Sequence, residues 1–347
     1  MHDREPVSRL IRPSEFDECL RWGLMQCEPS RTAELPRSDR ARCPLLSSGD
    51  RQTDPRSIIA AGTFGPAGLQ ALAIVRLVAG GSATVVLLAS DERFEASGSS
   101  ADQLAGLLRP LLGQLREWEV TFLQASAVET SQAERLRRCG FQRIAELSIL
   151  FLEPDDFAEV IVAARKGQEF GSKRQLGATW GWVPIAELGA GGNGRLASTL
   201  SATFRQTLDC PRLGRLRTAD EIVRGYIESP TLDREWSRLL QLNGQDIGCL
   251  LLSRHVGDEP REDIEARRGE GTGPLMELSY LGITPAYRGQ RWGFELVAEA
   301  VRVARLAGAT GVALAVDHEN TPAVAIYRFL GFRESEREGV WGRRVSG

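Results

Sequence analysis

The residues between Leu281 and Gly293 have the types and spacing of a phosphate-binding turn. They read LGITPAYRGQRWG: an apolar run ends, a proline interrupts it, and a glycine-containing turn leads at once into an amphipathic segment. Such a turn from strand to helix directs several main-chain N–H groups and the positive end of the helix dipole at one place. Pyrophosphate is a common ligand there, and glycine lets it approach the amides. Tight packing alone produces the same pattern, so the segment by itself leaves both interpretations open.

Two residues, one before this turn and one after it in the sequence, have side chains that can exchange protons. The phenol of Tyr327 has a reference pKa of about 10, so it stays protonated at neutral pH and can donate a proton. Its alternative role is packing beside Phe332. Glu277 lies on the apolar run that leads into the turn, and a carboxylate can take a proton from an ammonium group. Its alternative role is an ordinary ion pair on a strand.

Hydrophobic periodicity predicts the elements that position these residues. The expected strands are residues 179–185, 236–242, 247–253, 275–283 and 312–316, followed by a last strand or hairpin. The expected helices are residues 195–208, 219–228, 293–307 and 322–330. Asn243-Gly244 predicts a tight hairpin turn, and Thr218 with Glu221 predicts a capping box. Antiparallel strands that lead into a βαβ unit indicate a mixed α/β fold.

The chain also contains a weak internal repeat. Residues 135–141 (RLRRCGF) match residues 326–332 (IYRFLGF) in pattern, and each follows an apolar run and a long amphipathic helix. The order strand, helix, strand, helix, Gly-Phe, strand is thus used twice. This predicts two similar domains, residues 1–165 and 178–347.

The first copy lacks the residues that could do chemistry. Aligning the Gly-Phe pairs places Leu136 opposite Tyr327 and Glu129 opposite Asn320. The stretch that begins at Asp91 (DERFEASGSS) is acidic and would repel a phosphate. We therefore expect the N-terminal domain to be a degenerate partner of the C-terminal one.

The C-terminal motifs resemble a known family. LGITPAYRGQRWG and the pattern N-x-x-A-x-x-x-Y-x-x-x-G-F over residues 320–332 are similar to those of the GNAT superfamily of acetyl-CoA-dependent N-acetyltransferases. The resemblance is close over about residues 275–335, and residues 180–274 fit in element order. It implies tandem GNAT-like domains, acetyl-CoA as acyl donor and an amine-bearing acceptor. The alternative is a protein that binds acyl-CoA as a sensor or scaffold without turnover.

The resemblance implies a role for each motif residue. Main-chain N–H groups would hold the pyrophosphate, the strand before the turn would pair with the pantetheine arm, and a bulge at its glycine would open a slot. Glu277 would be the base and Tyr327 the acid. The implied cofactor-binding residues are Leu281, Gly282, Ile283, Arg288, Gly289, Gln290, Arg291, Trp292, Gly293 and Asn320.

Arg291 departs from the family's pattern, which has a glycine at this position. A larger residue is tolerated if its backbone stays helical, because an L-residue is unstrained at negative φ. The guanidinium then either adds a contact to phosphate or crowds the site.

Composition argues against several other classes. The net charge is −3 and Lys and Arg form no cluster, so we expect no nucleic-acid partner. No apolar run reaches the ~18 residues of a membrane span, and the N-terminus lacks the pattern of a secretion signal, so we expect a cytoplasmic protein. The six cysteines and three histidines are scattered, which predicts no metal site. We expect a monomer or a homodimer. Irregular loops are expected at residues 37–55 and 261–274, and a linker at 166–177.

Overall fold

The structure is a computed structural model of the whole chain. It describes residues 6–27, 57–91, 100–169, 179–189, 191–255 and 273–345. Four features of the sequence lie wholly or mostly outside these residues: the two predicted loops, the predicted linker and the acidic stretch after Asp91.

The chain folds into two compact units. Among the described residues, one unit contains those up to Ile144 and those from Gly339 onward, and the other contains those from Ala145 to Glu338. Strands β6 (Gln142–Leu152) and β12 (Arg333–Arg344) therefore each begin in one unit and end in the other. The predicted domains, residues 1–165 and 178–347, follow chain order and stay a prediction.

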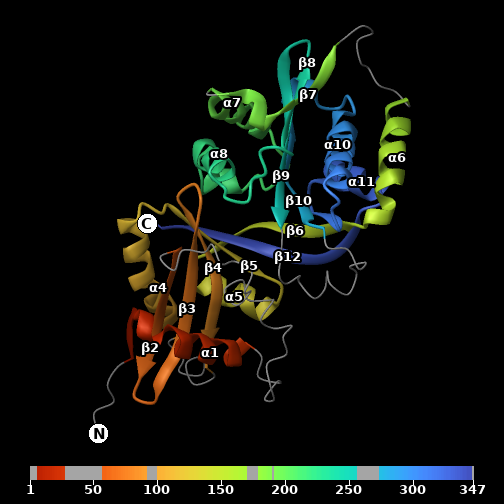
Figure 1. Cartoon of the computed structure of the whole chain (residues 1–347). Coiled ribbons are helices and arrows are strands. Elements are labelled where there is room, and N and C mark those ends of the chain that lie inside the picture. The colour runs from red at the N-terminus through yellow and green to blue at the C-terminus, as the bar shows by residue number, and fades with distance from the viewer. Residues whose placement is uncertain are drawn as a thin grey trace. The chain divides into compact units, whose positions relative to one another are not determined.

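The N-terminal unit is a sheet with helices on both faces (Figure 1). Its strands are β1 (Val7–Leu10), β2 (Ile58–Gly65), β3 (Gly68–Val78), β4 (Ser82–Ser90), β5 (Phe122–Ala127) and the end of β12, hydrogen-bonded in that order. Its helices are α1 (Phe16–Cys27), α4 (Ser100–Glu117) and α5 (Thr130–Arg138). On β3, Ile74 packs with α1, whereas its neighbours Ala73 and Val75 pack with α4. Successive side chains of a strand point to opposite faces, so both faces of this sheet are apolar.

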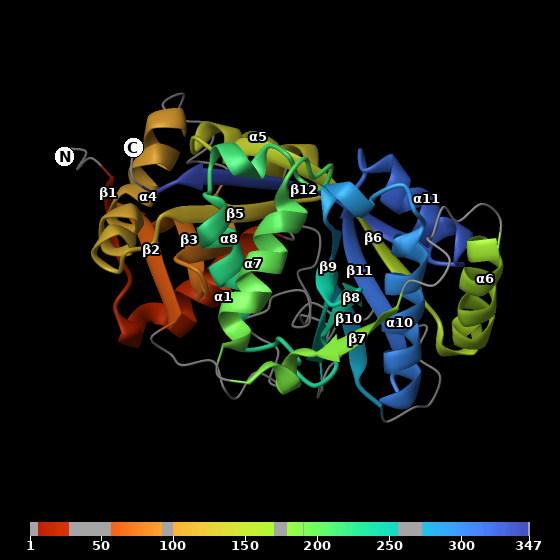
Figure 2. The same ribbon diagram turned by 90° about the horizontal axis from the view of Figure 1, so that it is seen from above.

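The C-terminal unit has the same layered plan. Its strands are β7 (Trp180–Pro184), β8 (Arg238–Leu242), β9 (Gln245–His255), β10 (Leu275–Ile283), β11 (Gly311–Asp317), most of β6 and the start of β12, in the order β12-β6-β11-β10-β9-β8-β7. Its helices are α6 (Phe157–Glu169), α7 (Gly192–Phe204), α8 (Ala219–Ile227), α10 (Trp292–Leu306) and α11 (Thr321–Phe329). Figures 1 and 2 show α6, α10 and α11 on one face of β8–β11 and α7 and α8 on the other. The predicted mixed α/β class is confirmed.

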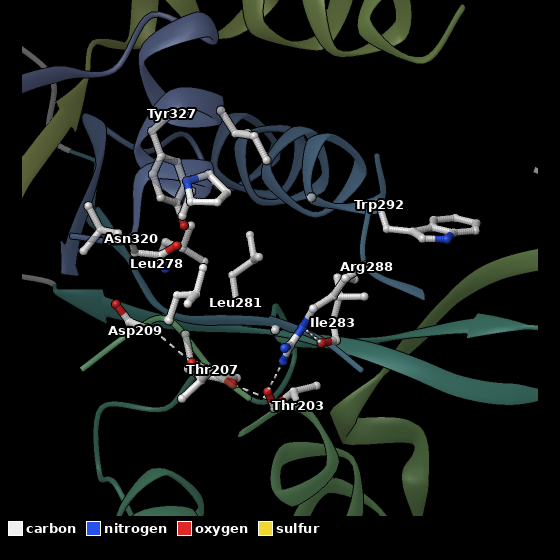
Figure 3. A pocket seen from close by; sticks show the side chains of 18 of the residues that line it. Thr203, Thr207, Asp209, Leu278, Leu281, Ile283, Arg288, Trp292, Asn320 and Tyr327 are labelled. Carbon is white, nitrogen blue, oxygen red and sulfur yellow. Dashed lines mark hydrogen bonds between the residues drawn. The ribbon is translucent and has the colours of Figure 1, made fainter. Parts of the chain in front are cut away.

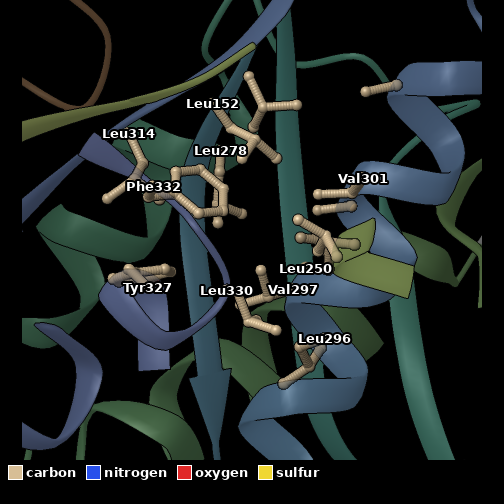
Figure 4. Packing of buried hydrophobic residues seen from close by; sticks show 14 of the residues in the cluster. Leu152, Leu250, Leu278, Leu296, Val297, Val301, Leu314, Tyr327, Leu330 and Phe332 are labelled. Atoms are coloured by element: carbon tan, nitrogen blue, oxygen red, sulfur yellow. The ribbon is translucent and has the colours of Figure 1, made fainter. Parts of the chain in front are cut away.

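Helix α10 packs on the centre of this sheet through the face that periodicity predicts. Val297, Val301 and Ala304 are buried, and Figure 4 shows the two valines beside Leu250 of β9. Phe294, predicted for the same face, is only half-buried and packs edge-on against a surface phenylalanine of α11.

The predicted hairpin turn and the predicted capping box are also confirmed, but one predicted helix ends earlier than expected. Asn243 and Gly244 have φ of 49° and 80°, as a type I′ hairpin turn requires. The N–H of Glu221 donates to the Thr218 hydroxyl, and the Glu221 carboxylate accepts from the Thr218 N–H. The helix predicted to reach Leu208 ends at Phe204 instead, because residues after it form a loop bonded to the end of β11.

The repeat is visible in how α5 and α11 end. Both helices stop at a left-handed glycine, Gly140 or Gly331, with φ of 77° and 89°. The N–H of the phenylalanine that follows donates to the carbonyl of Leu136 in one copy and of Tyr327 in the other, at 3.0 Å in both. This is a Schellman motif, which forms without backbone strain only when the left-handed residue tolerates positive φ, as glycine does. The Gly-Phe match thus reflects a shared helix terminus.

Gly282 of β10 is needed for the close approach of α7. A Cβ atom at this position would lie 2.7 Å from the Thr203 Cβ and 2.7 Å from the Tyr280 hydroxyl oxygen. We expect Gly282→Ala to lower the free energy of unfolding by about 1–3 kcal/mol, because overpacking displaces neighbours. Gly181→Ala on β7 is the matched control, since nothing lies within 4 Å of its added Cβ. If Gly282→Ala and Gly181→Ala unfold at the same urea concentration, the close approach of α7 to β10 at Gly282 is contradicted.

Candidate active site

Strands β10 and β11 separate halfway along their length. They pair in parallel from Leu275–Gly311 to Leu278–Leu314, and the pairing ends there. At the same point the register of β10 against β9 shifts, so that Ser279 is an extra residue in β10. The bulge predicted at Gly282 is therefore at Ser279. Such a bulge increases local twist and turns the strand away from its neighbour.

The N-terminal unit repeats this geometry. Strands β4 and β5 pair in parallel up to Val85–Ala125, and the register of β4 against β3 shifts so that Val86 is the extra residue. Counting from the bulge places Thr84 at the position of Glu277. The pocket beside this separation measures about 140 Å³. The first copy thus keeps the backbone geometry without the carboxylate, which agrees with its predicted degeneracy.

A pocket of about 680 Å³ occupies the separation between β10 and β11. Ten of the twelve site residues expected from the sequence line it: Leu281, Gly282, Ile283, Arg288, Gly289, Arg291, Trp292, Gly293, Asn320 and Tyr327. In Figure 3, Arg288 lies at one end of the pocket and Asn320 and Tyr327 lie at the other, with Leu281 between them. The tertiary structure therefore joins the turn before α10 to α11.

The turn before α10 presents open amides to this pocket. Within the described part of the chain, the N–H groups of Gly289, Gln290 and Gly293 donate no hydrogen bond. The N-cap residue Arg291 provides no side-chain cap either. These amides and the helix dipole therefore form an anion site that protein groups do not fill.

Arg288 serves a different purpose from the one expected. Its N–H donates to the Pro285 carbonyl, so the open amides begin at Gly289. Its guanidinium donates to three carbonyls, those of Ile283, Thr203 and Gln206, at 2.7–3.0 Å (Figure 3). Arg288 thus fixes the end of β10 against the end of α7.

Arg291 contradicts the expectation of a helical backbone. Its φ is 63° and its ψ 17°, which is the left-handed region. The family's glycine at this position adopts such angles without strain, whereas an L-residue pays roughly 1–2 kcal/mol.

We therefore expect Arg291→Gly to raise the free energy of unfolding by about 0.5–1 kcal/mol, less than the full strain because glycine also gains freedom in the unfolded chain. Arg291→Ala is the control, because alanine retains the strain. Urea unfolding compares the two, and a glycine variant no more stable than the alanine variant would show that the left-handed backbone carries no strain.

Tyr327 is buried at the far end of the pocket and its ring packs edge-on against Phe332, 5.6 Å between centroids. Burial raises the pKa of Tyr327 well above its ordinary value, and the nearby carboxylate of Asp209 adds to the shift. The phenol therefore stays protonated at neutral pH and can act as a proton donor.

Glu277 and Gln290 do not line the pocket. The Glu277 carboxylate lies 2.7 Å from Nε2 of His255, and both side chains are more than two-fifths exposed. The Gln290 side chain donates to the Ala286 carbonyl. Glu277 is thus a partly exposed strand residue hydrogen-bonded to His255, two residues before the bulge at Ser279, and a bridging water would be needed for it to reach the pocket.

Sequence reasoning missed the residues of α7 and its following loop that complete the pocket, among them Thr203 and Asp209. No spacing in the sequence connects them with α11, more than a hundred residues later. Within the described residues there is no group of three or more potential metal ligands. None of the helices there is long and apolar enough to span a membrane.

Comparison with known proteins agrees with this geometry. Residues 209–332 match the model of the Acetyltransferase (GNAT) family. A mycothiol acetyltransferase of Corynebacterium glutamicum (strain R) is 42% identical over 67 residues, which are 19% of this chain and 23% of that protein. One of Thermobifida fusca (strain YX) is 37% identical over 70 residues, 20% of this chain and 22% of that protein. The match thus spans under a quarter of these relatives.

A solved structure supports the fold of the whole chain. The GCN5-related glucosamine N-acetyltransferase region of a fungal multi-domain GH3 β-N-acetylglucosaminidase aligns over 99% of this chain and 38% of its own, with a TM-score of 0.58 and 11% identity. At this identity the likeness concerns the fold alone. Residues 209–332 therefore form a GNAT acetyltransferase region within this chain.

Proposed function

We propose that the C-terminal unit transfers an acetyl or longer acyl group from acyl-CoA to a primary amine. The observation that carries this proposal is the pocket between β10 and β11, which extends from the open amides before α10 to the Tyr327 phenol. The family membership of residues 209–332 supports the same reaction class.

The residues of the pocket fit acyl-CoA. The N–H groups of Gly289, Gln290 and Gly293 would hold the diphosphate, as helix N-termini do in other phosphate sites. Past Leu278, β10 has no partner on its β11 side, so the amides of the pantetheine arm can pair with it like an added strand. Asn320 would hydrogen-bond the arm. When bound, acyl-CoA supplies an activated thioester carbonyl.

Two protons must move during the transfer, and Tyr327 is suited to one of them. Its phenol would donate to the sulfur that leaves. The family resemblance assigns the base to Glu277, which would take the proton of the ammonium group through a water. That water is required because Glu277 lies outside the pocket lining.

Calorimetry with acetyl-CoA and a thiol-release assay test the proposal. The acceptor panel contains ethanolamine, glucosamine, lysine amide and a short peptide with a free N-terminus. We expect saturable acetyl-CoA binding and free thiol that appears only when an amine is present. Absence of acetyl-CoA binding would exclude both the enzyme and an acyl-CoA sensor.

A sensor or scaffold that binds acyl-CoA without turnover is the second candidate. Arg291 favours it, because an arginine replaces the family's glycine beside the open amides. Acetyl-CoA binding with no thiol release from any amine of the panel would select this alternative.

A further inference from the structure

A carboxyl group that the family motifs do not include lies at the reacting end of the pocket. Asp209 is in the loop between α7 and α8, and it lines the pocket together with Asn320 and Tyr327. Figure 3 shows its side chain on the side of Asn320 and Leu278, at the opposite end from Arg288. A donor laid along β10 from the open amides would bring its thioester toward this carboxyl.

Hydrogen bonds fix the Asp209 carboxyl in place. Its Oδ1 accepts from the N–H of Asp317 at 3.0 Å, and the Asn320 side chain is a second hydrogen-bond partner. In return, Asp317 Oδ2 accepts from the N–H of Cys210 at 3.0 Å. The loop after α7 is thereby tied to the end of β11, and the carboxyl keeps one position at the pocket wall.

The charges around the pocket favour an ammonium group at Asp209. Among the residues that line the pocket, Asp209 is the only acid. The two basic residues of the lining, Arg288 and Arg291, both belong to the turn before α10, and the guanidinium of Arg288, at the far end of the pocket, is bonded to three carbonyls. A half-buried carboxylate without a basic neighbour attracts a cation, and a primary amine is a cation at neutral pH.

We propose that Asp209 receives the acceptor's ammonium group and takes its first proton. This inference rests on the proposed acyl transfer and assigns the base to Asp209 in place of Glu277, because Asp209 lines the pocket and Glu277 does not. The ammonium transfers one proton to the Asp209 carboxylate, and the freed lone pair forms the C–N bond while the C–S bond breaks. The sulfur takes a proton from the Tyr327 phenol, the second proton of the amine nitrogen restores that phenol, and the proton on Asp209 returns to solvent.

The neighbouring ionisable groups are compatible with this role. Burial raises the pKa of Asp209 above its ordinary value, and the nearby Asp317 adds to the shift, while hydrogen bonds from Asp317 N–H and Asn320 oppose it. The charge of Asp209 also acts on Tyr226, Tyr280, Tyr327 and the thiol of Cys210, and burial raises the pKa of each, so all four stay neutral. A base works only when ionised, so activity must fall as pH drops through the raised pKa of Asp209.

The test compares Asp209→Asn, Glu277→Gln and Asn320→Ala in the full-length protein, using acetyl-CoA and the panel amine with the highest rate. We expect Asp209→Asn to lower kcat/KM by about 10²–10³-fold and to remove the acidic limb of the pH profile. Asp209→Asn should keep the acetyl-CoA affinity of the wild type. Asp209→Glu, which again supplies a carboxylate, should restore the acidic limb of the pH profile. Glu277→Gln should leave that limb in place.

A direct titration supplies a readout besides activity. In protein with ¹³C-labelled aspartate carboxyls, the resonance absent from Asp209→Asn should titrate above the ordinary aspartate pKa of about 3.9 and at the midpoint of the acidic limb. Because the raised pKa means that ionised Asp209 costs stability at neutral pH, Asp209→Asn should melt no lower than wild type at pH 8.

Three results would overturn the inference. In the first two, the pH profile of kcat/KM keeps its acidic limb in Asp209→Asn, or loses that limb in Glu277→Gln instead. In the third, Asp209→Asn loses as much acetyl-CoA affinity as Asn320→Ala does. The last would mean that Asp209 acts by positioning Asn320. Failure of the proposed function would look different, because wild-type protein would then release no thiol.

Discussion

Gly289→Glu is expected to abolish acetyl-CoA binding. Gly289 has a φ of 74° and its N–H is one of the open amides at the pocket. A glutamate here would place a carboxylate against the diphosphate, and its Cβ would be strained at positive φ. Calorimetry with acetyl-CoA should detect no saturable binding by the variant protein.

Two further variants separate charge from strain. Gly308→Glu adds the same charge at a glycine with φ of 64°, but at the C-terminal end of α10, so it should lose stability and keep acetyl-CoA affinity. Gly289→Ala adds the strain alone and should weaken binding without abolishing it. Wild-type affinity in Gly289→Glu would show that the diphosphate binds elsewhere.

Tyr327→Phe is expected to lower kcat by about 10²–10³-fold, the usual contribution of a positioned proton donor. The change removes one hydroxyl group and leaves the ring packed on Phe332, so acetyl-CoA affinity should hardly change. Steady-state thiol release gives kcat, and calorimetry gives the affinity.

The matched control is Tyr226→Phe. Tyr226 is another tyrosine of the C-terminal unit whose pKa burial raises. Its ring stacks on Phe204 and lies tilted against Tyr280, but it does not line the pocket. It should keep wild-type kcat. Equal turnover in Tyr327→Phe and wild type would remove Tyr327 as the proton donor.

The sequence predicted the features whose causes are local. The Asn243-Gly244 turn, the Thr218–Glu221 cap and the buried face of α10 each depend on residues within a few positions of one another. Propensity, capping and periodicity act over that distance, so the sequence pattern determines them directly. The ends of α5 and α11 match for the same reason.

The site could be predicted only in part. Its turn and α11 were found because each is a contiguous motif. The sequence favours a bulge at Gly282, but the structure has it at Ser279, because the register is set by pairing with β9. The glycine at 282 instead makes room for α7.

By itself, then, the sequence determined the order of the elements, the open turn and the candidate acid. Only the tertiary structure decided that Arg291 has a left-handed backbone, that Glu277 lies outside the pocket lining and that Asp209 lies within it. The physical reason is that these groups lie far apart along the sequence. Asp209 is held by the main chain of Asp317, 108 residues away, and folding alone brings such groups together.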